Sequence, residues 1–392
     1  MDKVKEIGLY IHIPFCKSKC FYCDFVSFSN ISDKEDKYIE CLLKDIKNEG
    51  FQNRILSKNG YEEEYLIDTI FIGGGTPSYI KDVHIKEILE TIKENFNVKE
   101  DAEITIEVNP GTVDIKKLKT YKEAGVNRLS IGLQVSQANL LKEIGRIHTY
   151  KDFVNTFKAA RKVGFNNINV DLLIGLPNQK GEDAKDTINK VLELNPEHIS
   201  VYSLILEDGT ILNSLIKAGK LELPEDEEER VMYWYIKGIL KEHGYNHYEI
   251  SNYAKEGYEC KHNLHCWKQK EYLGYGINSS SFLNDVRYTK IDKIDKYIEN
   301  IEKEQFSKNL IFDERLDIDD KMKEYMLLGL RTIEGVSIKE FKEKFNTNPF
   351  MLYFESLDKL LKDDLIKLED QKIFLTAKGI DLANIVWEEF ID

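Results

Sequence analysis

The stretch YIHIPFCKSKCFYCDF, residues 10–25, places three cysteines within eight positions, directly after a short apolar run. Cys16, Cys20 and Cys23 have the spacing C-x3-C-x2-C, and aromatic residues stand beside them. The chain has 392 residues but only six cysteines, so half of its thiols lie in this one segment. Thiolates are soft metal ligands and redox-active groups, so the stretch indicates a metal or redox centre.

Four interpretations of the three cysteines compete. A structural zinc site normally needs four protein ligands, and no second C-x2-C pair is present to complete one. A thioredoxin-like dithiol would use Cys20 and Cys23 and needs no third cysteine upstream. Unliganded buried thiols are common in proteins, but three of them at this spacing would be a coincidence. An iron–sulfur cubane held by three cysteines accounts for all of them and leaves one iron open to a small molecule.

The first 220 residues around this stretch alternate short apolar runs with longer amphipathic ones, which predicts strand and helix units around a parallel sheet. Strands are expected at GLYIHI (8–13), DTIFIGG (68–74), EITIEV (103–108), RLSIGL (128–133), INVDLLIGL (168–176) and HISVYSLIL (198–206), and helices at 33–49, 81–95, 114–124 and 150–163. Six such units predict an α/β fold with a partial (β/α)6 barrel.

The carboxyl ends of the expected strands carry the unusual residues, and sites in parallel α/β folds gather at such ends. The first strand runs into the cysteines and the second into GGGTP at 73–77. The later strands lead to Glu107 and Asn109, to Gln134, and to the stretch around Asp171 and Gly175. The sequence therefore predicts one site at this end of the barrel.

The pattern changes after about residue 222. Residues 223–244 predict a helix, and 245–290, rich in Tyr, Asn, Ser and Gly, predict strands and a functional loop. Further helices, a hairpin formed by LIKLED and KIFLT, and a last helix from Ala377 predict a small helical domain that resembles a winged helix. We expect a barrel core at 1–244, a connecting segment at 245–315 and this winged-helix-like domain at 316–392.

The composition limits the partners. Acidic residues outnumber basic ones 69 to 55, and the net charge of −14 repels nucleic acid, so we expect no nucleic-acid partner and interpret the last domain as a packing or partner module. No run approaches eighteen uninterrupted apolar residues, and the first residues lack the layout of a secretory signal. With few, clustered cysteines, the chain is expected to be reduced and cytoplasmic, with membrane contact limited to peripheral binding.

The spacing C-x3-C-x2-C, with an aromatic residue before the third cysteine, resembles that of the radical S-adenosylmethionine (SAM) enzymes. The resemblance implies a [4Fe-4S] cluster on Cys16, Cys20 and Cys23 whose open iron chelates SAM, and reductive cleavage of SAM to a 5′-deoxyadenosyl radical. It extends to GGGTP at 73–77, which in that family lies along the methionine part of the cofactor.

Within this superfamily the chain resembles the oxygen-independent coproporphyrinogen III dehydrogenases and their relatives, the HemW-type haem chaperones, through YIHIPFC, GGGTPS, IEVNP, GVNRLSIGLQ, GRIHTY and VDLLIGLP. The resemblance implies a SAM pocket with Ile205 near the adenine and with Tyr10, Tyr22, Gly74, Gly75, Thr76, Glu107, Gln134, Arg146 and Asp171 around the rest. Arg128 and His148 are interpreted as ordinary core or surface residues.

Two features separate the relatives. The dehydrogenases carry a further cysteine two positions after the third, where this chain has Phe25. HNLHCW, residues 262–267, is similar to the H-N-x-x-Y-W signature of the chaperone branch, whose histidine is proposed to bind haem. The resemblance thus implies His262 as the haem ligand, with His265 or Cys266 as a second ligand. Cys266 replaces the tyrosine of the signature, and Ser280 stands where relatives often have histidine.

The resemblance predicts a protein that binds haem and passes it to a haem-requiring acceptor, such as a membrane respiratory protein, and that receives electrons from a flavodoxin or ferredoxin. Two alternatives stay open. The same scaffold would serve an oxidative decarboxylase that turns two propionates of coproporphyrinogen III into vinyl groups. The chain would otherwise be a cluster-bearing redox or interaction protein that does not cleave SAM.

Overall fold

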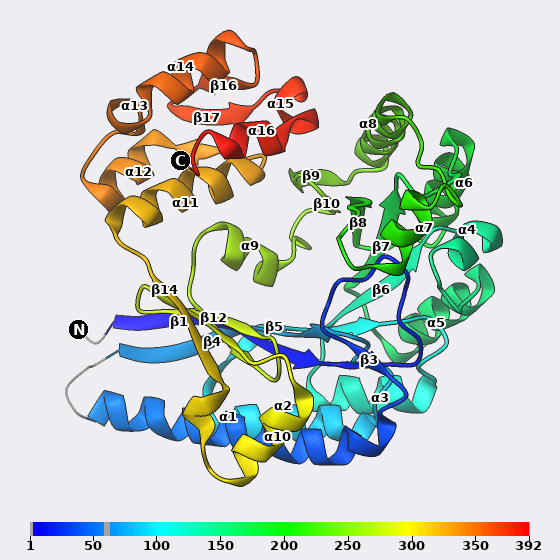
Figure 1. The fold of residues 1–392 in the computed structure, drawn as a ribbon, viewed down its shortest axis with the longest axis vertical. Coiled ribbons are helices and arrows are strands. Elements are labelled where there is room, and N and C mark those ends of the chain that lie inside the picture. Colours follow the sequence, from blue (N-terminus) through cyan, green and yellow to red (C-terminus); the bar gives the residue numbers. More distant parts are fainter. Residues whose placement is uncertain (1–2, 59–62, 392) are drawn as a thin grey trace.

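The computed structural model describes residues 3–58 and 63–391, and its main feature is one sheet that runs through the molecule (Figure 1). In the described part this sheet has twelve strands, in the order β14-β13-β12-β11-β1-β4-β5-β6-β7-β8-β10-β9. Its middle consists of parallel neighbours: β1 (Lys3–Ile13), β4 (Glu63–Gly74), β5 (Asn97–Val108), β6 (Arg128–Gln134), β7 (Ile168–Ile174) and β8 (His198–Ser203). All six predicted strands are present, and the predicted α/β class is confirmed.

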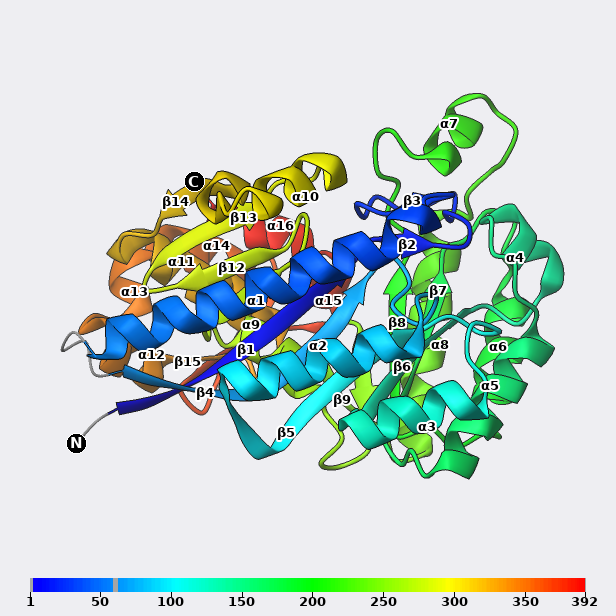
Figure 2. The same cartoon turned by 90° about the horizontal axis from the view of Figure 1, so that it is seen from below.

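Helices that connect these strands cover the outer face of the sheet (Figures 1 and 2). They are α1 (Glu35–Lys58), α2 (Asp82–Asn95), α3 (Ile115–Ala124), α5 (Tyr150–Val163), α6 (Gly181–Leu192) and α8 (Asp226–Glu242). Asp114 caps α3, and Thr149 forms a capping box with Asp152 at the start of α5, so local sequence sets both starts. The predicted helix at 33–49 is too short, because the helical propensity of the residues after Gly50 carries α1 on to Lys58.

Short elements fill the connections between the main strands and helices. They are β2 (Phe15–Cys16), β3 (Phe28–Ser29), a 3-10 turn at Ser32–Lys34, α4 (Ala138–Glu143) and α7 (Ile211–Lys217). The parallel pair β2–β3 closes the segment that contains the three cysteines, because Phe15 lies opposite Phe28 and Cys16 opposite Ser29.

Residues 245–315 extend the sheet on both sides. The elements are β9 (Asn246–Glu249), β10 (Asn252–Ala254), α9 (Lys261–Trp267), β11 (Tyr272–Tyr275), β12 (Ser280–Leu283), β13 (Val286–Lys290), α10 (Ile294–Glu302), a 3-10 turn at Phe306–Asn309 and β14 (Leu310–Arg315). The predicted strands are present, but the loop expected around HNLHCW is wrong, because these residues form α9. The Glu103 carboxylate, on β5, accepts hydrogen bonds from the first two amides of α9 and so replaces a local capping residue.

The carboxyl-terminal residues form a second core, packed around Met326, Phe341 and Leu357. Its elements are α11 (Ile318–Arg331), β15 (Val336–Ser337), α12 (Ile338–Phe345), α13 (Pro349–Leu352), α14 (Phe354–Lys362), β16 (Ile366–Glu369), β17 (Lys372–Leu375), α15 (Ala377–Asp381) and α16 (Ala383–Glu388). The hairpin β16–β17 forms the expected wing. Helix α9 lies between this unit and the barrel in Figure 1, and it contacts both: the Arg331 guanidinium of α11 lies 4.3 Å from the centroid of the Trp267 ring, and His262 Nδ1 lies 2.9 Å from the Thr69 hydroxyl of β4.

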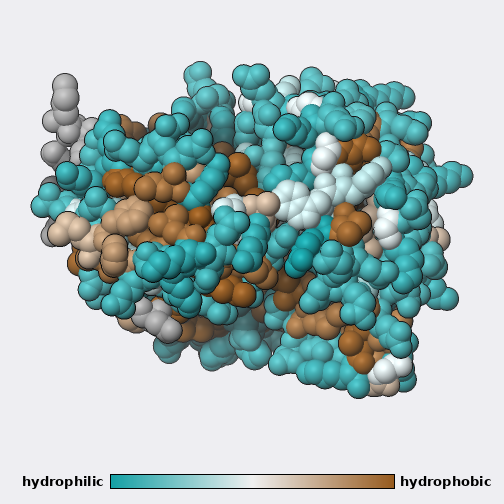
Figure 3. All heavy atoms as spheres, turned by 90° about the horizontal axis from the view of Figure 1, so that it is seen from above, coloured by the Kyte–Doolittle hydropathy of each residue, from teal (hydrophilic) through white to brown (hydrophobic). Residues whose placement is uncertain are grey.

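The surface is mostly polar. Figure 3 shows charged and polar side chains over much of one face, with apolar side chains gathered in part of it. Exposed apolar residues of the carboxyl-terminal unit include Met351, Leu352 and Phe354. Of the helices in the described ranges, none combines the length and the apolar character needed to cross a bilayer.

Candidate cofactor site

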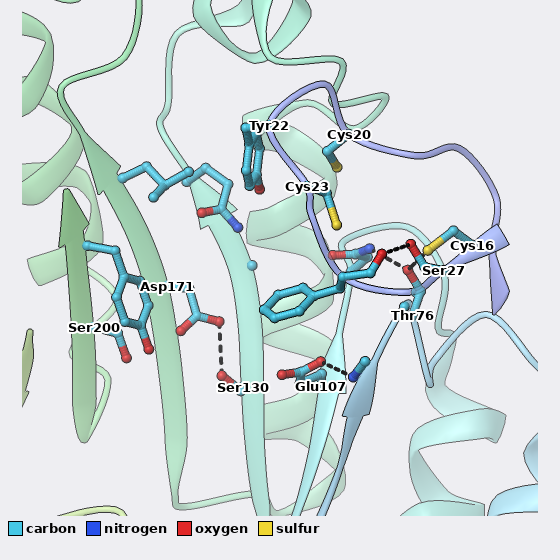
Figure 4. A pocket seen from close by; sticks show the side chains of 18 of the residues that line it. Cys16, Cys20, Tyr22, Cys23, Ser27, Thr76, Glu107, Ser130, Asp171 and Ser200 are labelled. Carbon is cyan, nitrogen blue, oxygen red and sulfur yellow. Dashed lines mark hydrogen bonds between the residues drawn. The ribbon is translucent and has the colours of Figure 1, made fainter. Parts of the chain in front are cut away.

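A cavity of about 480 Å³ lies inside the barrel, between the cysteine segment and the central strands (Figure 4). It is lined by all but two of the predicted site residues, namely Cys16, Cys20, Cys23, Tyr22, Gly74, Gly75, Thr76, Glu107, Gln134, Arg146, Asp171 and Ile205. Tyr10 and His262 are the two that do not line it. A volume of this size is typical of small-ligand sites.

The cavity has two ends, which we name the rim and the floor. The rim comprises residues 16–25 and 73–77 together with Arg146, and it lies at the carboxyl ends of the strands. The floor comprises Arg128 and α9, whose first amides are held by Glu103 of β5, and it lies toward the amino end of β6. Strand residues that point inward alternate, so β6 lines the cavity with Arg128, Ser130, Gly132 and Gln134.

The GGGTP segment holds the first cysteine in place at the rim. The amide of Gly75 donates to the Ile13 carbonyl at 2.8 Å, and the Thr76 hydroxyl donates to Cys16 Sγ at 3.5 Å. A Cβ atom on Gly75 would lie 3.0 Å from the same sulfur, which is closer than ordinary packing allows. A glycine is therefore needed where the second strand passes the cysteine segment.

The three thiols suit a cluster better than a single zinc ion. Four sulfurs around zinc stand about 3.8 Å apart, given Zn–S bonds of about 2.3 Å. The sulfurs of Cys16, Cys20 and Cys23 do not all lie within 4.8 Å of one another. Burial raises the pKa of Cys16 and Cys23, so these thiols need nearby positive charge to ionise, and a metal cluster would supply it.

Arg146 connects the two motifs of the rim. Its guanidinium donates to Asn109 Oδ1 at 2.7 Å and to the Tyr22 hydroxyl at 2.9 Å. Asn109 in turn donates to Thr76 at 2.8 Å, so the chain of contacts runs from Tyr22 to the residue that bonds Cys16. A guanidinium fixed in this way offers its remaining N–H groups to an acid group of a ligand.

Two half-buried carboxyl groups face the middle of the cavity (Figure 4). Glu107 accepts a hydrogen bond from the Gly74 amide at 3.2 Å, and burial, with the nearby Asp171 charge, raises the pKa of Glu107 to about 8. Asp171 accepts from Ser130 at 2.9 Å and from Asn169 at 2.8 Å, and burial raises its pKa as well. Hydroxyl or ammonium groups of a ligand would donate hydrogen bonds to those lone pairs of the Glu107 and Asp171 carboxylate oxygens that lack a donor among the described residues.

Gln134 and Ile205 complete the lining but differ in exposure. Gln134 has a φ of +70° beside a register shift between β6 and β7, and this strained backbone ends β6 at the cavity. Ile205 lines the cavity mouth and is 69% exposed, so its side chain is available to a ligand's apolar face.

Tyr10 and His262 contact the cavity wall through Phe71. The Phe71 ring lines the cavity, and it stacks on Tyr10 at 6.4 Å and on His262 at 5.2 Å between ring centroids. The Tyr10 hydroxyl lies 3.1 Å from Nδ1 of His12. The resemblance places both residues near ligands, and the structure puts one ring between them and the cavity.

The floor is built around the predicted haem ligand. Nδ1 of His262 is 2.9 Å from the Thr69 hydroxyl, and burial lowers the pKa of His262 to about 3, so the imidazole is neutral. Its Nε2 has no hydrogen-bond partner within the described ranges. His265 instead pairs with Asp68 at 2.8 Å, and burial raises the pKa of Cys266 to about 11. His262 and His265 thus each keep one ring nitrogen without a hydrogen-bond partner among the described residues, Nε2 in His262 and the buried Nδ1 in His265, and the choice of His262 follows the resemblance.

Several cavity residues were not predicted from the sequence: Arg128, Ser130, Asn169, Ser200, Tyr202 and Asn263 line it as well. The strand residues among them share one signal, since each stands an even number of places from a predicted site residue or from another cavity residue on its strand. The period of two, counted from Gln134 on β6 and from Asp171 on β7, would have found Arg128, Ser130 and Asn169, whereas β8 carried no predicted site residue from which to count. Asn263 carries no such signal, because it lies on α9.

Comparisons with known proteins agree with this arrangement. The model of the Radical SAM superfamily matches residues 10–191, and that of the HemN C-terminal domain matches residues 316–382. The heme chaperone HemW of Lactococcus lactis is 37% identical over 387 residues, which are 99% of this chain and 98% of the relative. The heme chaperone HemW of Bacillus subtilis is 37% identical over 97% of this chain and 98% of its own length.

A solved structure has the same fold. Coproporphyrinogen III oxidase (HemN) from Escherichia coli superimposes with a TM-score of 0.83, covering 99% of this chain and 90% of that one. The sequence identity in this pair is 23%, so the similarity shows the fold alone.

Proposed function

This chain belongs to the radical SAM superfamily and, within it, to the family of the heme chaperone HemW proteins, and from this premise we propose that it binds a [4Fe-4S] cluster, SAM and haem and delivers the haem to acceptor proteins. The observation that carries the proposal is one cavity with three thiols at its rim and the helix of the predicted haem ligand at its floor. Phe25 supports the chaperone branch, because it occupies the position of the dehydrogenases' additional cysteine.

In this proposal Cys16, Cys20 and Cys23 hold the cluster and leave one iron without a protein ligand. The bound cluster and SAM together supply one-electron reductive chemistry. The chain's own residues bind and orient the cofactor. Arg146 offers N–H groups to an acid group, while the Gly74–Thr76 backbone allows close approach.

Glu107 and Asp171 would accept hydrogen bonds from hydroxyl or ammonium groups of SAM. Because burial raises the pKa of both groups, an ammonium nearby would favour their charged forms. Gln134, Ile205 and Tyr22 would complete the pocket. This assignment of roles follows the family resemblance, and the shared cavity supports it.

His262 is our proposed haem ligand. A neutral imidazole with a free Nε2 is a suitable axial ligand for haem iron. The Phe71 ring stacks on one face of this imidazole, whereas the Nε2 lone pair lies in the ring plane, so the stacking orients the ring without covering the ligating position. The acceptor protein, and a flavodoxin or ferredoxin as electron donor, stay predictions.

The haem claim is tested by titrating the reconstituted protein with haem and recording the Soret band. His262→Ala is expected to shift or abolish the band of the wild type. His265→Ala is the matched control on the same helix, since the His265 ring is already paired with Asp68. A wild type with no haem spectrum contradicts the chaperone function, and a band that depends on His265 but not on His262 contradicts the ligand assignment.

The cluster claim is tested by anaerobic iron and sulfide analysis with electron paramagnetic resonance, recorded with and without SAM. Alanine at position 16, 20 or 23 is expected to remove the cluster signal, whereas Cys41→Ala, within α1, keeps it. Zinc in place of iron contradicts the proposal. A divinyl product from coproporphyrinogen III under reduction identifies the decarboxylase instead, and absence of 5′-deoxyadenosine indicates a protein that does not cleave SAM.

A further inference from the structure

Arg128 is a buried cation at the floor of the cavity. It is the first residue of β6, it is 2% exposed, and its side chain lines the cavity together with Asn169 and Asn263. Nothing in the sequence around Arg128 marks it as more than an ordinary residue of the fold. Its surroundings in the fold give it another role.

The Arg128 guanidinium has no direct partner among the described residues. It takes part in none of their hydrogen bonds or ion pairs, and its Nε is buried without an acceptor. Other partly buried arginines are paired, as Arg161 is with Glu197 at 2.8 Å and Arg331 with Glu249 at 3.0 Å. A buried charge without a partner is unfavourable, and proteins normally pair such groups or bind an ion there.

The carboxylates that act on Arg128 through space are occupied by other groups. Glu103 accepts from the amides of Lys261 and His262, each at 3.1 Å, and so holds the start of α9. Asp171 accepts from Ser130 and Asn169. Neither carboxylate forms an ion pair with Arg128. The N–H groups of the Arg128 guanidinium therefore lie at the cavity without a protein acceptor in the described part of the chain.

A planar guanidinium with several free N–H groups matches a carboxylate in two-pronged fashion. Arg128 and Gln134 lie at opposite ends of β6, six residues and thus roughly 20 Å apart along the strand. Arg146, near Gln134, serves the rim. A ligand group bound by Arg128 is therefore well separated from one bound at the rim by Arg146.

We propose that Arg128 binds a carboxylate of the cargo at the cavity floor, of the propionate type that haem carries. This inference rests on the proposed function, because a porphyrin is the carboxylate-bearing ligand that it names. The second possible source of a carboxylate is the methionine part of SAM, and the test separates the two.

The test compares haem with haem dimethyl ester, whose propionates are uncharged, by Soret titration of the reconstituted protein. Arg128→Met is expected to weaken haem binding about tenfold or more, while Arg128→Lys loses less affinity, because it keeps the charge but not the two-pronged contact. The ester is expected to bind the wild type and Arg128→Met equally. SAM binding, measured by equilibrium dialysis, is expected to be the same in both.

Three results would overturn the inference. SAM affinity that falls in Arg128→Met, with haem affinity unchanged, would assign the guanidinium to the cofactor. Equal affinity of the wild type for haem and for its ester would show that no contact to a propionate carboxylate contributes to haem binding. A ligand-free Arg128→Met protein that melts well below the wild type and binds haem with unchanged affinity would show that Arg128 supports the fold instead.

Failure of the proposed function has a separate signature. If the wild type gives no haem spectrum, the same variants are titrated with metal-free coproporphyrin III and followed by its fluorescence. Binding that depends on Arg128 then supports the carboxylate site, although the protein is no haem chaperone. If neither haem nor coproporphyrin III binds in a way that depends on Arg128, the carboxylate site itself is overturned.

Discussion

The rim and the floor of the cavity differ in how the chain builds them and in the charge they need. The rim comes largely from two short segments, 16–25 and 73–77, and presents thiols that require positive charge to ionise. The floor combines strands with a helix that follows more than a hundred residues later, and it holds an unpaired cation, Arg128. One cavity thus has an end suited to a cationic centre and an end suited to an anion.

The rim should be the less tolerant end, and Gly74→Ala tests this with the largest expected effect. Gly74 has a φ of +107°, and a Cβ there would lie 2.6 Å from the His12 ring. That ring is 3% exposed and is held by the Val26 carbonyl at 2.8 Å, so it cannot move aside easily. We expect a loss of about 3 kcal/mol in the free energy of unfolding, measured by urea denaturation.

Gly164→Ala is the matched control. Gly164 ends α5 with a φ of +97°, and a Cβ there would meet nothing within 4 Å. It should lose only about 1–2 kcal/mol, the penalty of the left-handed backbone itself. Equal losses in the two variants would mean that the rim around Gly74 is not tightly packed.

Two glutamates of β5, Glu103 and Glu107, allow the floor and the rim side of the cavity to be compared within one strand. The expected change in the free energy of unfolding is smaller than for Gly74→Ala. Glu103→Gln leaves one acceptor oxygen for the two amides of α9, and its new NH₂ group would face an amide donor. We expect a loss of about 2 kcal/mol at neutral pH. Glu107→Gln, the control at the rim side, should keep or gain stability, because the raised pKa of Glu107 already keeps it mostly neutral there.

Hydrogen exchange can locate the Glu103 effect, since the amides at the start of α9 should lose protection in Glu103→Gln and not in Glu107→Gln. If the two variants lose equal stability, Glu103 does not hold the floor helix. The start of α9 at the floor would then not depend on the Glu103 carboxylate, although the hydrogen bonds indicate that it does.

The same contrast explains which parts of the site the sequence could predict. The three cysteines proposed to hold the cluster lie within eight residues, so their spacing indicated them, and the six central strands followed from their apolar runs. The loop expected at 261–267 was wrong, because the group that caps α9 stands 158 residues from Lys261 in the sequence. A local pattern cannot contain a stabilising contact from so distant a strand.

Arg128 was underestimated for a related reason. Its sequence neighbourhood, NRLS, gives no sign that Glu103 and Asp171 will be engaged elsewhere. Only the completed hydrogen-bond network leaves the guanidinium unpaired. The division of the chain into domains at 244 and 315 stays a prediction, although residues 245–315 add strands to both sides of the barrel sheet.

Over a single pH unit, the smallest expected effect is a pH dependence of opposite sign at Glu107 and at His262. Glu107 in the folded protein holds its proton up to about pH 8, whereas the unfolded chain releases it near 4.5, so this group's stabilisation is full below 4.5 and is lost as the pH rises to 8. His262 stays neutral down to about pH 3, whereas the unfolded chain takes up a proton below 6.5. Stability therefore falls as the pH drops from 6.5 toward 3.

Each group contributes a slope of at most about 1.4 kcal/mol per pH unit within its window. Urea denaturation of the metal-free protein between pH 5 and 8 measures both. Glu107→Gln should flatten the curve toward alkaline pH, and His262→Gln should flatten the acid side only in part, because burial also lowers the pKa of His12 and His148 to about 4. If both variants altered the same side of the curve, the prediction that Glu107 and His262 change stability in opposite pH directions would be contradicted. The two groups would then respond to one shared change in the fold.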